Sequence, residues 1–357
     1  MAKTTTIGPF HPFLLEPFKL DLKVDNGIIK EVRVEVGFTH RGIEELMQRN
    51  IYRGNLFIAE RVCGICSTVH GTVYCETVEK IFEIEIPERA KFIRTVVLEL
   101  ERLRSHYLNL GLIFHAVGFE KGFEKSLQGR EEVMDLIEMM SGNRVNPSIS
   151  TIGGVRWDIS EMVAKKILNT LPQLKKSAET LLNFLNNEDV LKGTEDIGFL
   201  SKEDALKFGA LGPVARGSGW KRDIRWNEPY EVYKELGFEC VIEENGDVLS
   251  RTKVRAKENL ESIRLIEKAL KEIPEGEIKV EMPEPKEGEH LGRIEAPRGE
   301  LVYFIKSDGT NIPSRVKLRA PSFNNLRALS EMLRSEKEKY ARQIIESMDP
   351  CLSCTDR

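Results

Sequence analysis

Two stretches, ERVCGICSTVH at residues 60–70 and DPCLSCTDR at residues 349–357, each carry a Cys-x-x-Cys pair. A separation of 285 positions lies between Cys66 and Cys351, so the four thiols meet only if the fold carries the tail into the interior. A frayed terminus would be an unusual place for two cysteines. The sequence therefore predicts that the last residues of the chain are part of a site.

Four thiolates define the kind of metal that this site would bind. Thiolates are soft ligands, so they suit zinc, iron–sulfur, nickel or copper rather than magnesium or calcium. A structural zinc site usually has its cysteine pairs about 12–20 residues apart, and a chain of 357 residues needs no metal in place of a hydrophobic core. A thioredoxin-like motif would use one pair and leave the other unexplained. The spacing favours a redox or catalytic metal, with structural zinc as the alternative.

The composition narrows the class of protein. The chain is 41% hydrophobic and 31% charged, which allows a large core in roughly one to three domains. Its net charge of −4 gives no general attraction for nucleic acid or anionic lipid. The sequence has no uncharged apolar run of ~18 residues and no signal peptide, and its six cysteines then indicate a reducing compartment. We expect a soluble chain in the cytoplasm.

The hydrophobic patterns predict strands first and helices later. Alternating runs at 18–24 and 28–36 flank the turn Asp25-Asn26-Gly27, which is a hairpin signal. From Pro87 to about Val117 the apolar residues recur every three or four positions, which predicts a long helix. Further helices are expected near residues 130–140, 160–187, 253–273 and 323–347.

These patterns predict a mainly α fold of the α+β class, in which a bundle of long helices forms the core beside a small N-terminal β element. We expect one domain over residues 1–357. Within it, residues 1–40 are β-rich and residues 87–350 form the helical core. A solvated loop excursion rich in proline and glutamate is expected near residues 273–297.

The two cysteine stretches resemble the nickel–iron signatures of NiFe hydrogenase large subunits. The chain resembles most closely the energy-converting, membrane-bound branch, which is related to the catalytic-core (49 kDa) subunit of respiratory complex I. The similarity extends in order over nearly the whole chain, through Gly8-Pro9-Phe10-His11-Pro12, His40-Arg41-Gly42-Ile43-Glu44, Glu99-Leu100-Glu101-Arg102 with Ser105-His106, Ser141-Gly142-Asn143-Arg144, Ala215-Arg216-Gly217-Ser218-Gly219, and Glu295-Ala296-Pro297-Arg298-Gly299-Glu300. It implies a hydrogenase large-subunit-like fold.

The resemblance implies how four cysteines would hold a nickel–iron centre. Cys63 and Cys351 would bind nickel alone, and Cys66 and Cys354 would bridge nickel to iron. The iron in such sites carries cyanide and carbonyl ligands. Many relatives have an extension that is cut off at the third residue after the last cysteine, and Arg357 occupies that position; both removal of an extension and its absence from the gene fit this sequence.

Several residues near the cysteines are candidates for proton transfer and for support of the centre. The resemblance makes Glu44 and Glu16 two candidates for the carboxylate that carries protons from the nickel thiolate; on its own each fits a surface carboxylate. It places Arg298, after Pro297, over the metals and toward the diatomic ligands of the iron, where its fixed donors suit an anionic cluster. His70 is one helical turn after Cys66 and is a candidate hydrogen-bond donor to a bridging sulfur. Asp349 would cap the final turn, the simpler interpretation, or pair with Arg298.

Other polar motifs have simpler explanations. Glu99, Arg102 and His106 share one face of the long helix; we expect a salt-bridged solvent face, and the complex I resemblance offers a buried proton path as the alternative. The loop Arg216–Gly219 lacks the spacing of a nucleotide fingerprint, so a close backbone approach near the metal site or a partner is expected. Cys75 and Cys240 are isolated and are expected to be buried small hydrophobes.

The resemblance implies the large subunit of an energy-converting NiFe hydrogenase, which catalyses 2H⁺ + 2e⁻ ⇌ H₂ and is coupled to ion translocation. With four cysteines assigned, the chain cannot ligate an iron–sulfur cluster by the usual four-cysteine rule. The implied partners are a small subunit with a proximal 4Fe-4S cluster, integral membrane ion-translocating subunits and a ferredoxin-type electron carrier, which would place the chain on the cytoplasmic face of a membrane. The alternatives are a complex I-like or sulfur-reducing relative without hydrogenase activity, in which one or more of the cysteines are replaced, and a non-catalytic scaffold with a four-thiolate zinc site.

Overall fold

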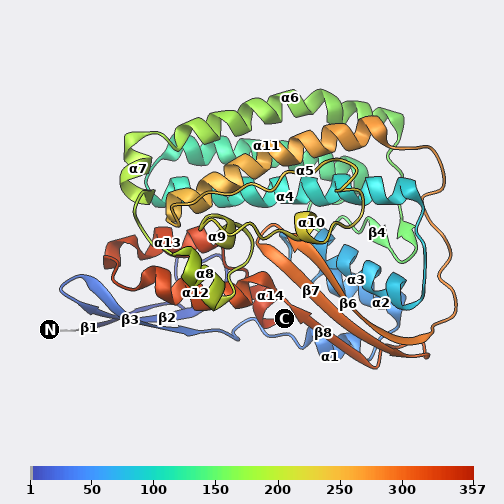
Figure 1. Cartoon of the computed structure of the whole chain (residues 1–357), viewed down its shortest axis with the longest axis horizontal. Helices are drawn as coiled ribbons and strands as arrows, with labels where there is room; N and C mark the ends of the chain where they lie inside the picture. The colour runs from blue at the N-terminus through green and yellow to red at the C-terminus, as the bar shows by residue number, and fades with distance from the viewer. Residues whose placement is uncertain (1–2) are drawn as a thin grey trace.

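The computed structural model describes residues 3–357 and has a layer of long helices above two small sheets (Figure 1). In this view the helices run along the upper side of the molecule, one sheet lies at each lower end, and the last helix of the chain lies between the sheets. The long helices are α4 (Glu88–Ala116), α5 (Glu120–Ser141), α6 (Glu161–Phe184) and α11 (Val248–Glu272). The mainly α, α+β fold class predicted from the sequence is thereby confirmed.

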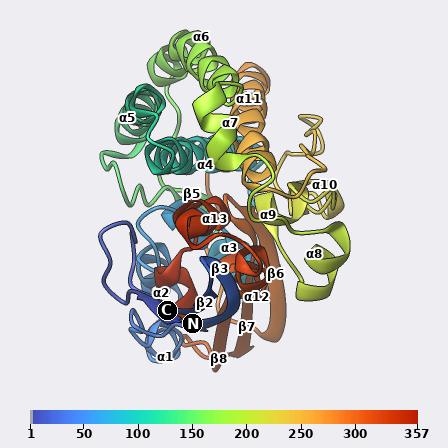
Figure 2. The same ribbon diagram turned by 90° about the vertical axis from the view of Figure 1, so that its left-hand side faces the viewer.

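Helix α4 is the central helix of this layer. Its apolar residues recur at helical spacing, and they are buried between α5 and α11 (Figure 2). The helix begins after Pro87 and ends near Val117, as the sequence predicts. The predicted helices near 160–187 and 253–273 correspond to α6 and α11, and the one near 130–140 is the second half of the longer α5.

The N-terminal β element is an antiparallel sheet in the order β1-β2-β3. Its strands are β1 (Lys3–Ile7), β2 (Lys19–Asp25) and β3 (Ile28–Glu35). Asn26 and Gly27 both take positive φ, 50° and 78°, as a tight turn between twisted strands requires. The predicted hairpin is therefore confirmed, and β1 extends it by one strand that the sequence pattern did not indicate.

A second antiparallel sheet corrects the expected loop excursion. Residues 287–296 form β6 (Glu287–Ala296), which pairs with β7 (Gly299–Asp308), and β7 pairs with β8 (Arg315–Arg319). The loop prediction therefore holds only for about 273–286. It failed because the outer half of β6 alternates exposed and half-buried residues and is rich in glutamate and glycine, whereas its inner end, from Ile294, is continuously buried. The expected helical core of 87–350 thus contains a sheet, visible at the lower right of Figure 1.

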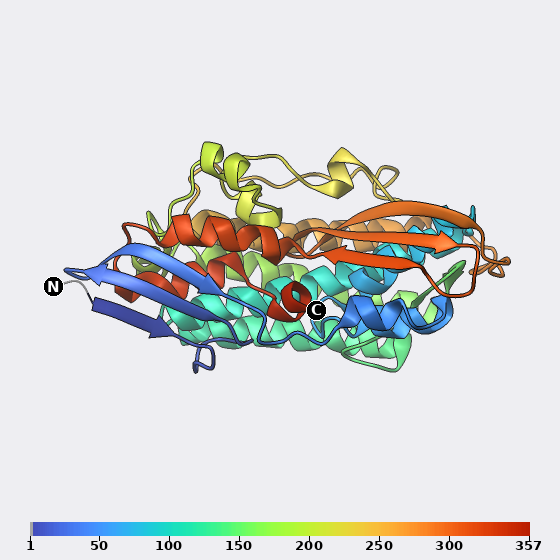
Figure 3. The same cartoon turned by 90° about the horizontal axis from the view of Figure 1, so that it is seen from below.

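The helix expected over 323–347 is two helices, α12 (Pro321–Leu333) and α13 (Ala341–Met348). Between them Ser335 takes φ 66° and donates its N–H to the carbonyl of Ile29, and Ile28 forms a bridge with Lys337. The interruption exists because this polar segment pairs with the N-terminal sheet. Figure 3 shows the resulting contact of the two ends of the sequence, with α12 above β3 and the C-terminal helix beside the centre of the molecule.

Shorter elements complete the described chain. They are α1 (Ile43–Met47), α2 (Tyr52–Glu60), α3 (Ser67–Ile81), β4 (Ser150–Thr151), β5 (Gly154–Val155), α7 (Glu188–Thr194), α8 (Lys202–Phe208), α9 (Gly212–Arg216), α10 (Ile224–Asn227), the 3₁₀ turn Glu338–Tyr340 and α14 (Leu352–Asp356). Within residues 3–357, no helix combines the length and the apolar character needed to cross a membrane.

Candidate metal centre

The four cysteines of the two Cys-x-x-Cys pairs lie together in the interior. Their sulfur atoms are all within 4.8 Å of one another, and all four residues are buried. The Sγ atoms of Cys63 and Cys351 are 3.4 Å apart, as are those of Cys66 and Cys354. The tail therefore folds inward, as the sequence predicts, and gives a tetrad of soft donors suited to a thiophilic metal.

The first cysteine pair is fixed by the long helix α4. Helix α3 begins at Ser67, directly after Cys66, and its first N–H groups would be unsatisfied without a partner. The buried carboxylate of Glu101 in α4 accepts the N–H groups of Thr68 at 2.8 Å and Val69 at 2.9 Å. Arg104, one turn further along α4, donates to the carbonyl of Ile65 at 2.8 Å.

The second cysteine pair is fixed by contacts from both ends of the sequence. Asp349 ends α13 with φ 60°, which turns the chain so that α14 begins at Leu352. The N–H of Cys351 donates to Ser322 Oγ at 3.0 Å. The carboxylate of Glu16 accepts the N–H groups of Leu352 and Ser353 and the hydroxyl of Ser353.

Arg298 and Pro297 lie directly beside the sulfurs. Both line a small cavity of about 10 Å³ together with Cys66, Cys351 and Cys354. The buried guanidinium of Arg298 donates to Asp349 Oδ1 at 2.7 Å and to the Asp349 carbonyl at 2.9 Å. Asp349 therefore pairs with Arg298, the second of the two roles considered for it.

His70 contacts one of the sulfurs. Its Nε2 is 3.4 Å from Cys354 Sγ and its Nδ1 is 2.8 Å from the hydroxyl of Tyr303. Burial lowers the pKa of His70 to about 4, so the ring is neutral near pH 7. The arrangement fits a tautomer in which Tyr303 donates to Nδ1 and Nε2–H donates to the sulfur.

Glu16 and Glu44, the two candidate proton carriers, have different surroundings. Glu16 touches the turn between Cys351 and Cys354, as described above. Glu44 accepts the N–H of Leu318 and the guanidinium of Arg357, both at 3.0 Å, and pairs with Lys317. Burial would raise the pKa of Glu44, but these hydrogen bonds and the charge of Arg357 outweigh it and lower the pKa. Glu44 lines an open pocket of about 400 Å³ on the outer side of the tail.

The thiols perturb one another strongly. Hydrogen bonds from the sulfurs of Cys351, Cys354 and Cys66 lower the pKa of Cys63, with a further contribution from the charge of Arg298. Burial raises the pKa of Cys354. One thiol of the tetrad therefore loses its proton easily. A soft metal cation would displace the protons of the other three thiols, because metal ligation requires thiolates. Four sulfur donors beside a permanent positive charge fit an anionic nickel–iron centre.

Comparison with known families agrees with this site. The family described as "Respiratory-chain NADH dehydrogenase, 49 Kd subunit" matches residues 117–287 and 279–357, and the family described as "Nickel-dependent hydrogenase" matches residues 41–118. The chain belongs to the family that unites these two kinds of subunit. We refer to it below as the 49 kDa/hydrogenase family.

Relatives within the 49 kDa/hydrogenase family are similar over most of their length. The "Membrane-bound hydrogenase subunit alpha" of Pyrococcus furiosus is 41% identical, over 98% of this chain and 86% of the relative. The "Carbon monoxide-induced hydrogenase" of Rhodospirillum rubrum is 38% identical over 99% of each chain. Among solved structures, a chain of an archaeal membrane-bound sulfane sulfur reductase superimposes with a TM-score of 0.94 at 31% identity, covering 100% of this chain and 98% of that one. The relationship predicted from the sequence motifs is confirmed.

A buried network of charged side chains lies behind the centre, and it corrects the solvent face expected for Glu99, Arg102 and His106. All three side chains are buried. Glu99 pairs with Arg102 and Arg225, and it accepts the hydroxyl of Tyr233 at 2.6 Å. The expectation was wrong because Arg225 and Tyr233 come from a segment more than 120 positions away, which helical spacing alone does not reveal.

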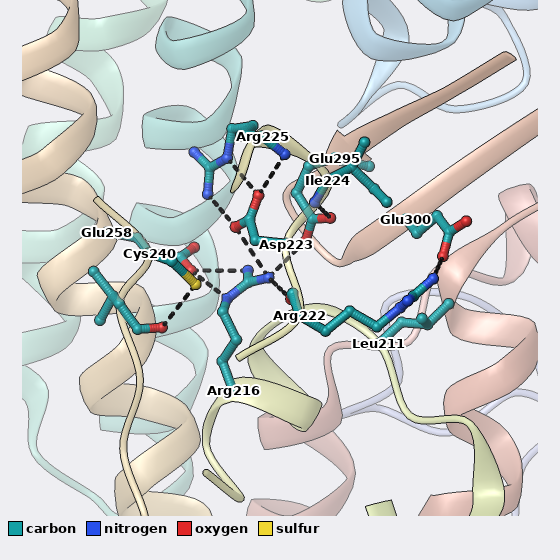
Figure 4. Close-up of polar contacts among 12 residues, drawn as sticks. Leu211, Arg216, Arg222, Asp223, Ile224, Arg225, Cys240, Glu258, Glu295 and Glu300 are labelled. Carbon is teal, nitrogen blue, oxygen red and sulfur yellow. Dashed lines mark hydrogen bonds and ion pairs between the residues drawn. The ribbon is translucent and has the colours of Figure 1, made fainter. Parts of the chain in front are cut away.

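Arg216 is the centre of this network (Figure 4). Its guanidinium lies 2.8 Å from Glu258, 2.7 Å from Glu295 and 3.1 Å from Asp223, and Glu258 in turn is 2.7 Å from His106. The Arg216–Gly219 loop makes close backbone contacts with residues 243–246. Cys75 is fully buried and Cys240 is partly buried, and burial raises the pKa of both thiols.

Two residues that hold the cysteine segments were not singled out by sequence reasoning. Glu101 and Arg41 both occur in the motifs that carry the family resemblance, so the signal was present. Their roles were hidden because each contacts backbone atoms of the cysteine segments, and such contacts leave no trace in the residue types of their partners.

Proposed function

We propose that this chain is the catalytic large subunit of an energy-converting NiFe hydrogenase. The reaction is 2H⁺ + 2e⁻ ⇌ H₂, coupled through partner subunits to ion translocation. The proposal goes beyond membership of an oxidoreductase family, because that family also contains NADH dehydrogenase subunits and a sulfur reductase.

The observation that carries the proposal is the complete set of four cysteine sulfurs within 4.8 Å of one another. Relatives that have lost hydrogen chemistry are expected to lack one or more of these cysteines, and this chain lacks none. Cys63 and Cys351 would hold nickel, and Cys66 and Cys354 would bridge it to iron. When bound, such a centre supplies an electron-rich site for heterolytic splitting of dihydrogen.

The surrounding side chains supply charge, orientation and a proton acceptor. Arg298 keeps a permanent positive charge beside the sulfurs, and Asp349 fixes its direction through two hydrogen bonds. Neutral His70 donates to Cys354 and so orients a sulfur that would be one of the ligands of the centre. Glu16, hydrogen bonded to the turn that carries Cys351 and Cys354, is the carboxylate best placed to take a proton from this segment.

Electrons would leave through a partner. Apart from the tetrad, the chain has only Cys75 and Cys240, too few for a four-cysteine cluster. We propose a small subunit with a proximal 4Fe-4S cluster, membrane subunits that translocate ions, and a ferredoxin-type carrier on the cytoplasmic side. The relatives' names support a membrane complex, since one is a membrane-bound hydrogenase and another belongs to an archaeal respiratory membrane complex.

The second candidate is a sulfur-reducing subunit without hydrogenase activity. It is favoured by the TM-score of 0.94 to the chain of the sulfane sulfur reductase. A zinc-stapled scaffold is the third candidate, and only the four-thiolate geometry favours it.

Metal analysis of the purified complex separates the three candidates. We expect nickel at about one per chain and infrared bands of metal-bound cyanide and carbonyl, together with hydrogen evolution from a reduced low-potential donor. Cys351→Ser is expected to abolish nickel binding and hydrogen evolution. Zinc alone, or polysulfide reduction without hydrogen evolution by the nickel-loaded complex, would refute the proposal.

A further inference from the structure

Arg41 links the two cysteine segments through their backbones. One Nη atom of its guanidinium donates to the carbonyl of Arg61 at 2.9 Å. The other Nη donates to the carbonyls of Val62 at 2.7 Å and Ser353 at 2.9 Å. Val62 directly precedes Cys63 and Ser353 directly precedes Cys354, so one side chain spans both halves of the tetrad.

The residues around Arg41 bind the tail on the same side. Thr39 donates its N–H and its hydroxyl to Asp356 Oδ2 at 3.0 and 2.9 Å. His40 Nδ1 is 2.7 Å from the Asp356 carbonyl, and the N–H of Arg41 donates to the carbonyl of Arg357 at 3.2 Å. The segment 39–41 therefore holds residues 353–357, while the side chain of Arg41 alone reaches across to residues 61–62.

We propose that Arg41 is a positioning residue that holds the two Cys-x-x-Cys segments in register, so that the four sulfurs are gathered before a metal binds. The cysteine pairs are 285 positions apart, and the second lies at a chain end, where the backbone tends to fray. Without a link the tetrad would have to be ordered by the metal itself, which weakens binding by the cost of that ordering.

The chemistry of arginine suits this role. Its planar fork satisfies several carbonyl groups at once, and its charge is permanent.

The inference concerns assembly of the sulfur site and can be tested without hydrogen chemistry. The full chain, produced without nickel, is titrated with Co²⁺ alone under reducing conditions, and the sulfur-to-cobalt charge-transfer absorption of a tetrathiolate site is recorded. Arg41→Gln removes both the fork and the charge, and Arg41→Lys keeps the charge alone. Arg49→Gln is the matched control, because exposed Arg49 pairs with Glu45 on the same short stretch of chain.

We expect the wild type and Arg49→Gln to bind one Co²⁺ per chain with the same dissociation constant. Arg41→Gln is expected to bind Co²⁺ at least about tenfold more weakly than the wild type. The affinity of Arg41→Lys is expected to lie between those of the wild type and Arg41→Gln. Peptide-resolved alkylation of the metal-free chains gives a second measurement: Arg41→Gln is expected to speed modification of Cys63 and Cys354 and leave buried Cys75 unchanged. Wild-type cobalt affinity in Arg41→Gln, or equal acceleration at Cys75, would overturn the inference. Failure of the proposed hydrogenase activity would leave these results unaffected.

Discussion

The contacts of Glu16 and Glu44 indicate which of the two carboxylates can carry protons. The carboxylate of Glu16 accepts hydrogen bonds from the turn that carries Cys351 and Cys354, through Leu352 and Ser353. Glu44 is held by two cationic side chains and a backbone N–H, and its pKa is lowered. A lowered pKa makes Glu44 a poor holder of a proton near pH 7. Glu16 contacts the turn between Cys351 and Cys354 directly, so we expect Glu16 to be the proton carrier.

We therefore expect Glu16→Gln to lower H₂/D⁺ exchange by about 100-fold or more, with nickel content and infrared bands unchanged. Glu44→Gln serves as the matched variant and is expected to lower exchange by less than about tenfold. Isotope exchange followed by mass spectrometry on the purified complex gives both rates. A larger loss of H₂/D⁺ exchange in Glu44→Gln than in Glu16→Gln would contradict the assignment.

At the scale of the elements, the buried network joins α4 and α11 to the inner end of β6. Glu99 in α4 is the member of this network whose pKa shows most clearly the effect of its neighbours. Burial alone would raise the pKa of Glu99, but the charges of Arg102 and Arg225, with hydrogen bonds from Ser262 and Tyr233, lower it to about 2. The folded-state pKa lies below the ordinary value of 4.5, so this stabilisation is present above pH 4.5 and is lost as the pH falls toward 2.

Glu99→Gln is accordingly expected to lower the free energy of unfolding by about 3 kcal/mol at pH 7 and by about half of that at pH 3. The loss arises because Arg102 remains buried without a counter-charge and Arg225 keeps only that of Asp223. Urea unfolding of both chains at the two pH values measures the difference, and exposed Glu45→Gln is the control. A difference that does not change with pH would show that the charge of Glu99 is not what stabilises these elements.

The elements differ in how far the sequence could predict them. Helix α4 was predictable because its apolar spacing reflects burial within one helix. The strand β6 was not predictable, because its outer half is glutamate-rich. The break between α12 and α13 was not predictable either, because it depends on pairing with Ile29.

In the site, the cysteines could be placed from their chemistry and the family motifs. The contacts of Arg41 and Glu101 could not, since they are made to backbone atoms.

At the scale of the whole molecule, the centre lies within one of three hydrophobic clusters, beside another cluster that includes Met348 and Leu352 of the C-terminal tail. The clusters lie within the long helices, between α3 and the β6–β8 sheet, and between the N-terminal sheet and α12–α13. The four cysteines belong to the second cluster and form a small part of it. A metal bound at this site would therefore not be the principal source of the fold's stability, in contrast to small zinc modules that unfold without their ion.

We expect the metal-free chain to keep the helical far-UV circular dichroism of the loaded chain and to unfold cooperatively on heating. Its Tm should be lower than that of the loaded chain, because a ligand that binds only the folded state adds to its stability. The described contacts explain why the loss should stay partial: Arg41, Glu16 and Ser322 hold the cysteine segments through the backbone and need no metal. Thermal melts of loaded and metal-free chains, with Cys351→Ser as a chain that cannot complete the tetrad, measure the effect. Loss of the cooperative transition in the metal-free chain would mean that the metal centre organises the fold. The metal would then bind first and gather the sulfurs, which is the reverse of the order that we infer.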